Sequence, residues 1–158
     1  MLQVAADDPV LRPLLEDLAR EYDARYAPTN GVPSSAELTR YPPSVFTEAQ
    51  GGAFLVVLEE GRPIAGGALM RTGDAAEVKR MWTRQDRRRQ GLAGVVLAGL
   101  EQRARRMGYR RLVLSTGAAQ PEAVALYLRH GWTAAFDPAV PQPPDAYLRF
   151  AKDLPPVP

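Results

Sequence analysis

The sequence of 158 residues contains no cysteine and only one histidine, His130. Without cysteine the chain cannot form disulfides, use a thiolate nucleophile or bind zinc through sulfur, and a single histidine argues against a histidine-based metal site. We therefore expect no metal, and any chemistry must depend on other side chains.

Long apolar runs are also lacking. No stretch approaches the roughly 20 apolar residues that span a bilayer, and the first residues lack the basic start and apolar centre of a signal peptide. We expect a cytoplasmic protein with no membrane partner. A hydrophobic content of 46% is enough for one core, and no linker or repeat divides the chain. The expected organisation is one domain over residues 1–158, with residues 155–158 as a disordered tail.

The formal net charge is only +2, so local charge is more informative than global charge. Arginines form two groups, one between residues 80 and 89 and one between residues 103 and 111. Nucleic-acid binding through these groups predicts steep salt dependence. However, the sequence has neither the aromatic interleaving of single-strand binders nor a DNA-reading motif. We therefore do not expect nucleic acid as a partner.

The spacing of apolar residues predicts both helices and strands. Helices are expected over residues 7–26, 36–40, 91–107 and 121–130, and strands over residues 53–58, 63–71, 77–83, 111–116, 132–136 and 146–152. Short turns make the first three strands antiparallel neighbours, whereas the helical crossover 91–107 makes strand 111–116 parallel to strand 77–83. The sequence predicts an α/β fold of the α+β type, with a mixed sheet of about six to seven strands flanked by about four helices.

The turn between strand 77–83 and the helix that follows has the features of a phosphate-binding site. Arg87, Arg88 and Arg89 precede Gly91, which allows a ligand to approach the backbone closely. The unpaired N–H groups and the positive dipole end of the helix face the same turn. A pyrophosphate would therefore find several hydrogen-bond donors there.

Two motifs give this chain a resemblance to a known family. The order Arg88-x-x-Gly91-x-Ala93 after a strand resembles the acetyl-CoA-binding signature of the GNAT N-acetyltransferase superfamily, Arg/Gln-x-x-Gly-x-Gly/Ala. Downstream, Tyr127-x-x-x-Gly131-Trp132 is similar to the family segment Tyr-x-x-x-Gly-Phe. The predicted element order over residues 51–153 resembles the GNAT fold as well. The resemblance implies a GNAT fold with acetyl-CoA as cosubstrate.

The resemblance also implies contacts along the pantetheine arm of acetyl-CoA. Backbone groups of Met81, Trp82 and Thr83, where the fourth strand of the family bulges, would pair with the arm and orient the thioester carbonyl. Gln120 stands where many relatives have an asparagine that binds the pantetheine or phosphate. Gln120 is therefore a further candidate for cofactor binding.

For the pyrophosphate, the resemblance implies a cradle of side chains and backbone amides. The side chains are those of Arg88 and Arg89. The amides are those of Arg89, Gln90, Gly91, Leu92, Ala93 and Gly94. For Arg84 and Arg87, an ordinary solvated arginine face is an equally open interpretation.

Acetylation of an amine removes a proton from an ammonium with a pKa near ~10 and must let a thiolate leave. Glu77 matches a position where some GNAT enzymes place a glutamate base, and we name it as the general base. The alternative is an ordinary carboxylate at the start of a strand. Tyr127 matches the tyrosine that the family aims at the CoA sulfur, and we name it as the proton donor. A phenol pKa of about 10 lies within roughly two units of that of a thiol. The alternative for Tyr127 is a tyrosine that fills core space.

The resemblance implies an acetyl-CoA-dependent N-acetyltransferase that acts on a primary amine of a small molecule or peptide. The absence of cysteine favours direct attack over a thiol shuttle. The alternative is a CoA-binding regulatory or partner-recognition module with little or no turnover. The acceptor should meet the first two helices and the loops 41–46 and 138–144. Ser115 replaces an acidic residue of one subgroup. Because many relatives dimerise, a homodimer is a further expectation.

Overall fold

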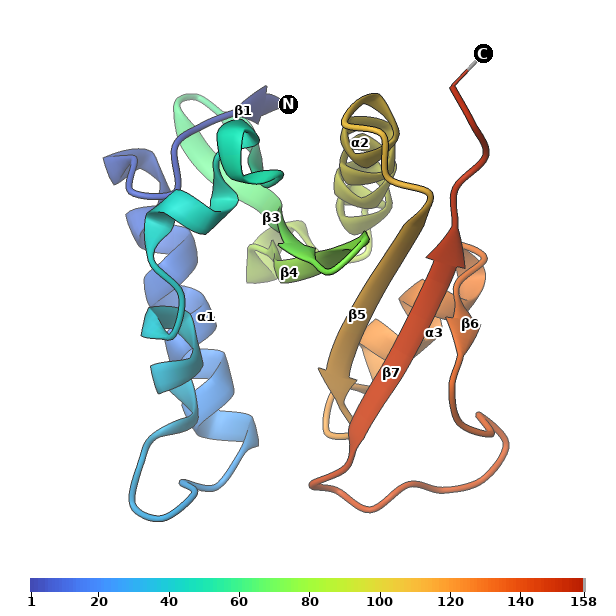
Figure 1. The fold of residues 1–158 in the computed structure, drawn as a ribbon. Coiled ribbons are helices and arrows are strands. Elements are labelled where there is room, and N and C mark those ends of the chain that lie inside the picture. The colour runs from blue at the N-terminus through green and yellow to red at the C-terminus, as the bar shows by residue number, and fades with distance from the viewer. Residues whose placement is uncertain (158) are drawn as a thin grey trace.

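The computed structural model describes residues 1–157, which form one seven-stranded sheet with helices on both faces (Figure 1). The strand order is β1-β2-β3-β4-β5-β7-β6, and every neighbouring pair is antiparallel except β4 and β5. The strands are β1 (Leu2–Gln3), β2 (Ala53–Glu59), β3 (Arg62–Thr72), β4 (Ala75–Thr83), β5 (Arg111–Gly117), β6 (Thr133–Ala134) and β7 (Tyr147–Asp153). The predicted mixed sheet and its single parallel pair are confirmed.

Three α-helices and five 3₁₀ helices surround the sheet within the described residues. The α-helices are α1 (Arg12–Arg25), α2 (Leu92–Arg106) and α3 (Pro121–Arg129). The 3₁₀ helices are η1 (Pro9–Leu11), η2 (Ser34–Thr39), η3 (Pro43–Phe46), η4 (Glu48–Gln50) and η5 (Gln85–Arg87). The predicted second helix is η2, whose 3₁₀ geometry suits a six-residue segment bounded by prolines.

The α1 face of the sheet holds one of two hydrophobic clusters. Phe54 and Val56 of β2 alternate with Leu55, so their side chains point to the same face and pack with Leu14 and Leu18 of α1. Both leucines are four residues apart, which places them on one side of the helix. The amphipathic spacing read from the sequence therefore positions α1 against the first half of the sheet.

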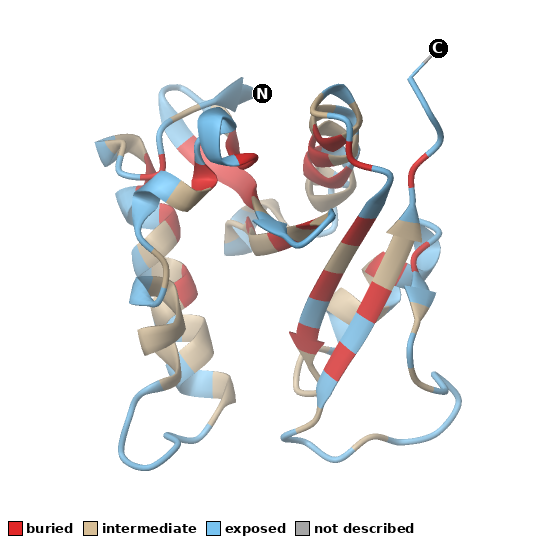
Figure 2. Cartoon of the chain, in the orientation of Figure 1, coloured by how far each residue is buried: buried red, intermediate tan, exposed pale blue. Residues whose placement is uncertain are grey.

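The opposite face carries α2 and α3. Leu97 and Leu100 of α2 pack in a second cluster with residues of all the central strands. In this cluster the ring of Tyr127 on α3 lies 5.4 Å from Phe150 and 5.8 Å from Trp132, measured between centroids. Buried and exposed residues alternate along β5 and β7 (Figure 2), so the second half of the sheet has one covered face and one open face.

Strands β4 and β5 stay paired over a very short distance. Their only register pairs are Ala76 with Leu112 and Glu77 with Val113 among the described residues. Beyond this point β5 remains paired with β7 along its whole length, whereas β4 continues with β3. The sheet therefore splits into two halves that diverge beyond Glu77.

A β-bulge lies on β4 beside this split. Ala68 pairs with Lys79 and Gly66 pairs with Trp82, so Arg80 and Met81 together stand opposite one residue of β3. Arg80 has a φ of 58°, in the left-handed region, as expected where an extra residue is inserted. The bulge expected in the fourth strand is confirmed, and it begins one residue before Met81.

The remaining differences from the sequence predictions concern short elements. The edge strand β1 was not predicted, because two exposed residues carry no periodic signal. Strand β6 covers only residues 133–134 of the predicted segment 132–136. The predicted tail, 155–158, ends at Pro158, which lies outside the described residues. The carbonyl oxygens of Pro155 and Pro156 accept hydrogen bonds from Arg105.

Candidate active site

A cavity of about 1040 Å³ opens over the split between β4 and β5. Its walls come from the end of α1, the segment through η2, the strands β4, β5 and β7, and α3. Five of the six tyrosines of the chain line it: Tyr22, Tyr26, Tyr41, Tyr127 and Tyr147. Its size is that of a site for a drug-sized ligand, and it brings together both residues predicted for catalysis.

Glu77 lies at the closed end of the split, in a chain of charged groups. Its carboxylate accepts a hydrogen bond from Thr72 Oγ1 at 3.1 Å, and the second carboxylate oxygen lies 3.2 Å from Lys79 Nζ. Lys79 Nζ also lies 3.3 Å from Glu37 on η2. Partial burial opposes the charge on Lys79, but Glu77 and Glu37 outweigh it and raise the pKa of the ammonium. Lys79 is therefore a fixed positive charge between two carboxylates.

Sequence reasoning did not single out Lys79, although a signal was available. Residues two apart on a strand share a face, so the placement of Glu77 on the cavity also places Lys79 there. Glu37 gave no such signal, because a contact between residues 42 positions apart follows from the fold alone.

The bulge residues lie on the cavity side of β4. Met81 lines the cavity and has no register partner on β3, so its backbone groups are outside the regular ladder. Trp82 and Thr83 remain paired with Gly66 and Ala65. The indole of Trp82 is buried on the α1 face, where Nε1 donates to Asp17 at 2.9 Å. Of the three predicted strand contacts, Met81 has the freest backbone.

The predicted phosphate loop presents free amides. Gly91 caps α2 with a φ of 77°, and the first intrahelical hydrogen bond runs from the amide of Val95 to the Gly91 carbonyl. Among the described residues, the six amides from Arg89 to Gly94 donate to no protein group. Arg89 also adopts a positive φ of 61°. Consecutive N–H groups in such a turn, at the positive end of a helix, form a concave site for an anion.

The guanidinium of Arg88 has two protein partners. It forms an ion pair with Glu21 of α1 and donates to the Thr83 carbonyl at 3.2 Å. Arg88 therefore ties α1 to the end of β4. Arg89, in contrast, is exposed and forms no ion pair within residues 1–157. The sequence could not reveal the Glu21 contact, which joins residues 67 positions apart.

Arg84 and Arg87 belong to an exposed network of ion pairs. Arg87 lies 2.6 Å from Glu59, and Arg84 lies 2.6 Å from Asp86. The hydrogen bond from Arg87 lowers the pKa of the Glu59 carboxyl below its ordinary value. This arrangement is the solvated arginine face that was one of the two interpretations for these residues.

Tyr127 is 6% exposed and lines the cavity from α3. Its hydroxyl has no hydrogen-bond partner among the described residues. Burial, with a smaller effect of Tyr22, raises the pKa of the phenol. The pKa of this buried phenol therefore lies further above that of a free thiol than the roughly two units that separate the ordinary values. Desolvation in the same place would also raise the pKa of a thiol.

Gln120 is held at the far side of the split. Its side-chain amide donates to the Tyr26 hydroxyl at 2.9 Å. The Tyr26 ring rests on Gly117, where a Cβ would overlap with the ring and its hydroxyl group. Next to it, Arg25 donates to the Ala119 carbonyl at 3.1 Å. The end of α1 therefore bridges the two halves of the sheet.

Only some of the segments expected to contact the acceptor line the observed cavity. The end of α1 and η2 contribute Tyr22, Tyr26 and Glu37. From the loop 41–46 only Tyr41 contributes, and the loop 138–144 contributes nothing, since the wall begins at Asp145. In Figure 1 the loop that precedes β7 runs on the β6 side of that strand, away from β4 and α1.

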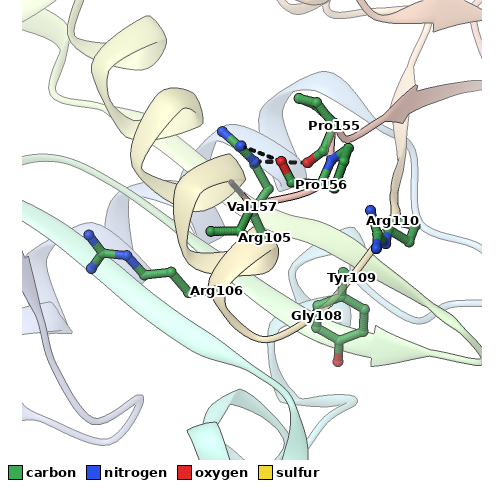
Figure 3. A pocket seen from close by; sticks show the side chains of 8 residues that line it. All are labelled: Arg105, Arg106, Gly108, Tyr109, Arg110, Pro155, Pro156 and Val157. Atoms are coloured by element: carbon green, nitrogen blue, oxygen red, sulfur yellow. Dashed lines mark hydrogen bonds between the residues drawn. The ribbon is translucent and has the colours of Figure 1, made fainter.

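A second, smaller hollow of about 400 Å³ lies near the other end of α2 (Figure 3). It is lined by Arg105, Arg106 and Arg110 together with residues 155–157, and Arg105 donates to two proline carbonyls across it. A 15-residue helix is about 22 Å long. This hollow is therefore remote from the phosphate loop and contains none of the candidate site residues.

Residues 1–157 contain neither a cluster of potential metal ligands nor a helix that could span a membrane. No group of three or more histidine, cysteine, aspartate or glutamate side chains is arranged to hold a metal ion. No helix in this range has the length and apolar character needed to cross a membrane.

Comparison with known proteins gives the family. The sequence model of the acetyltransferase (GNAT) family matches residues 14–132, which is most of the chain. No curated protein sequence matches. The chain belongs to the GNAT acetyltransferase family, whose general activity is the transfer of an acetyl group.

Solved structures agree with this assignment. A protein provisionally assigned as an acyl-CoA N-acyltransferase, from Klebsiella pneumoniae subsp. pneumoniae, is 26% identical, with 97% of this chain and 95% of that chain covered and a TM-score of 0.72. A GNAT acetyltransferase from Staphylococcus aureus is 12% identical, with coverages of 98% and 99% and a TM-score of 0.73. The ribosomal-protein-alanine N-acetyltransferase from Brucella melitensis is 18% identical, with coverages of 98% and 100% and a TM-score of 0.73. The last two likenesses show the fold.

Proposed function

We propose that this protein is an acetyl-CoA-dependent N-acetyltransferase that transfers the acetyl group to a primary amine of a small molecule or peptide by direct attack. One observation carries the proposal. The β4–β5 ladder ends after Glu77 and Val113, and a cavity with Glu77 and Tyr127 in its walls lies over the opening. The absence of any cysteine supports direct transfer, because no thiol can carry the acetyl group.

Three features fit acetyl-CoA, which supplies the activated acetyl group when bound. The free amides of residues 89–94, with the exposed side chain of Arg89, fit the pyrophosphate. The unpaired backbone of Met81 at the bulge fits the thioester carbonyl, and Trp82 and Thr83 extend this edge. Arg88 and Gln120 contribute from the flanks, where Arg88 pairs with Glu21 and Gln120 donates to Tyr26.

Proton transfer is assigned to the two predicted catalytic residues. Glu77 removes a proton from the ammonium of the acceptor, and the neutral amine that results attacks the thioester carbonyl. The carboxylate of Glu77 is held in place by Thr72 and Lys79. Tyr127 donates a proton to the departing sulfur. Because burial raises the pKa of its phenol, Tyr127 keeps its proton over the whole neutral range.

The test is an assay of CoA release with acetyl-CoA and a panel of primary amines. The protein has no thiol of its own, so a thiol-reactive dye reports only the CoA that is released. We expect release that depends on the amine. Absence of release above the buffer rate, together with no shift of the melting temperature by CoA, would contradict the proposal.

The second candidate is a CoA-binding module with little or no turnover. One observation favours it: the raised pKa of the buried Tyr127 makes this phenol a weaker acid than a free tyrosine. Stabilisation by CoA without amine-dependent release would identify this case. The cytoplasmic location and the homodimer expected from the sequence remain predictions.

A further inference from the structure

The charged groups of the cavity wall do not all neutralise one another. The wall carries four cations, Arg40, Lys79, Arg80 and Arg149, and three carboxylates, Glu37, Glu77 and Asp145. Lys79 is paired with both glutamates, and Arg40 lies 3.5 Å from Glu37. Within the part of the chain that the structure describes, this leaves Arg80 and Arg149 without a carboxylate partner.

The sheet register places Arg149 on the same face of the sheet as Glu77. Val113, Ser115 and Gly117 share one face of β5, and Arg149 of β7 is the register partner of Ser115. Glu77 is the register partner of Val113 on the same face. Val113 of β5 lies opposite Glu77, and Ala151 of β7 lies opposite Val113. Arg149 is two residues from Ala151, a distance of about 6 to 7 Å along β7. The residue opposite Arg149 is Ser115, which has no carboxylate to pair with the guanidinium.

Arg80 lies across the split from β5, at the bulge of β4. Its guanidinium donates to the Leu38 carbonyl at 2.7 Å and lies 4.5 Å from the centre of the Phe46 ring. Burial lowers the pKa of Arg80, yet the guanidinium stays charged. A guanidinium has five N–H donors, and only the contact with Leu38 occupies any of them among the described residues. Arg80 is a half-buried cation with donors to spare.

We infer that the acceptor of this enzyme carries an anionic group, a carboxylate or a phosphate, in addition to its amine, and that Arg149 binds this group with the help of Arg80. The inference rests on the proposed function. A guanidinium fork matches both anions. With the anion at Arg149, the amine of a short acceptor such as an α-amino acid or an aminoalkyl phosphate is held over the part of the split near Glu77. The single negative charge of Asp145 cannot neutralise the charges of both arginines.

The experiment compares pairs of acceptors that share a carbon skeleton and a primary amine, of which one member carries an anionic group and the other a neutral group in its place. Alanine is compared with alaninamide, phenylalanine with phenylalaninamide, and 2-aminoethyl phosphate with ethanolamine. We expect kcat/KM to favour the anionic member of at least one type, carboxylate or phosphate, by roughly ten- to a hundred-fold, the range of one hydrogen bond to a charged group. Comparison of the two types shows which anion the site accepts.

Three variants assign the preference to a residue. Arg149→Gln should remove the preference, and Arg149→Lys should keep part of it because the charge remains. Arg62→Gln, which alters an exposed arginine at the start of β3 outside the cavity wall, should keep all of it. A substitution of Arg80 would not isolate anion binding, because the hydrogen bond from Arg80 to the Leu38 carbonyl also holds η2.

The outcomes separate this inference from the proposed function. If the neutral members react as well as the anionic ones, or if Arg149→Gln keeps the preference, the inference is wrong and the proposed function stands. If no acceptor reacts, the proposed function fails. The same pairs are then titrated by calorimetry in the presence of CoA. Tighter binding of the anionic members that is lost in Arg149→Gln supports the inference, and equal or absent binding overturns it.

Discussion

Glu77 on β4 and Val113 on β5 form the last register pair between these two strands. The same two strands continue separately for several residues, one with β3 and the other with β7. A proposed proton acceptor therefore lies where the sheet begins to divide, and the free amides of residues 89–94 follow the other end of β4. This relationship explains how one strand can serve both the reacting group and the phosphates of the cosubstrate.

Replacement of Tyr127 by phenylalanine tests the proton donor. Tyr127→Phe should lower kcat by about a hundredfold while the Kd of CoA stays unchanged. The stability should change little, since the hydroxyl has no protein partner within the described residues. Tyr109→Phe is the control, because Tyr109 lies outside the cavity and donates to the Gly51 carbonyl at 2.7 Å. That variant should lose about 1 to 3 kcal/mol of stability and keep its activity. Equal kcat in Tyr127→Phe and wild type would remove the donor role.

Glu77→Gln tests the general base. The amide keeps the size of the side chain but cannot take up a proton, so kcat should fall by about a hundredfold or more. The matched control is Glu37→Gln, which also removes a carboxylate from Lys79. If the base is Glu77, the control should retain most of the activity. Equal losses in the two variants would mean that the neutralisation of Lys79, and not proton transfer, is what matters.

A pair of glycine substitutions separates loss of anion binding at the phosphate loop from the effect of backbone strain. Gly91 and Gly61 have φ values of 77° and 74°, and a Cβ at either position would meet nothing within 4 Å. Gly91→Ala and Gly61→Ala should each lose about 1 to 2 kcal/mol of stability. Only Gly91→Ala should raise the Kd of CoA, by roughly tenfold, the loss of one charge-assisted hydrogen bond. Calorimetry measures both. A similar Kd in the two variants would disprove the cradle.

The contact between Asp17 and Trp82 predicts a pH-dependent stability. Burial opposes the charge on Asp17, but hydrogen bonds from Arg20 and Trp82 outweigh it and lower the pKa of the carboxyl. A group with a lowered pKa in the folded state stabilises the fold above its ordinary pKa of about 4, and this contribution disappears as the pH falls through the folded value.

Asp17→Asn should therefore reduce the loss of stability of the protein between pH 5 and pH 3, roughly the range of this titration. Asp17→Ala should cost about 1 to 3 kcal/mol at neutral pH, because the buried indole N–H loses its acceptor. Urea denaturation at several pH values measures both effects. An unchanged acid dependence in Asp17→Asn would show that the contact does not contribute.

Much of the fold could be predicted from local patterns. The helices around Leu14 and Leu97 have apolar residues on one side, and the strands around Phe54 and Leu112 are short apolar runs between turns, so element type and order follow from the sequence. The single parallel pair followed from the length of the crossover. The 3₁₀ geometry of η2 could not be predicted, since it depends on how a short segment between prolines packs.

The candidate site was predicted less completely. Motif spacing predicted the loop at Gly91 and the position of Tyr127, because these features are local. The ion pair of Arg88 with Glu21, the contact of Gln120 with Tyr26 and the charges around Lys79 join distant segments. No local pattern encodes such contacts, and they became visible only with the fold.

The most direct measurement is a titration of the isotope-labelled protein with CoA, followed by NMR of the backbone amides. We expect the largest shifts at residues 89–94, at residues 80–83 in and after the bulge, and at the end of β5, because the proposed cosubstrate site lies between the two halves of the sheet. Shifts confined to the arginines near the end of α2, at Arg105 and Arg110, or no shifts at saturating CoA, would contradict it.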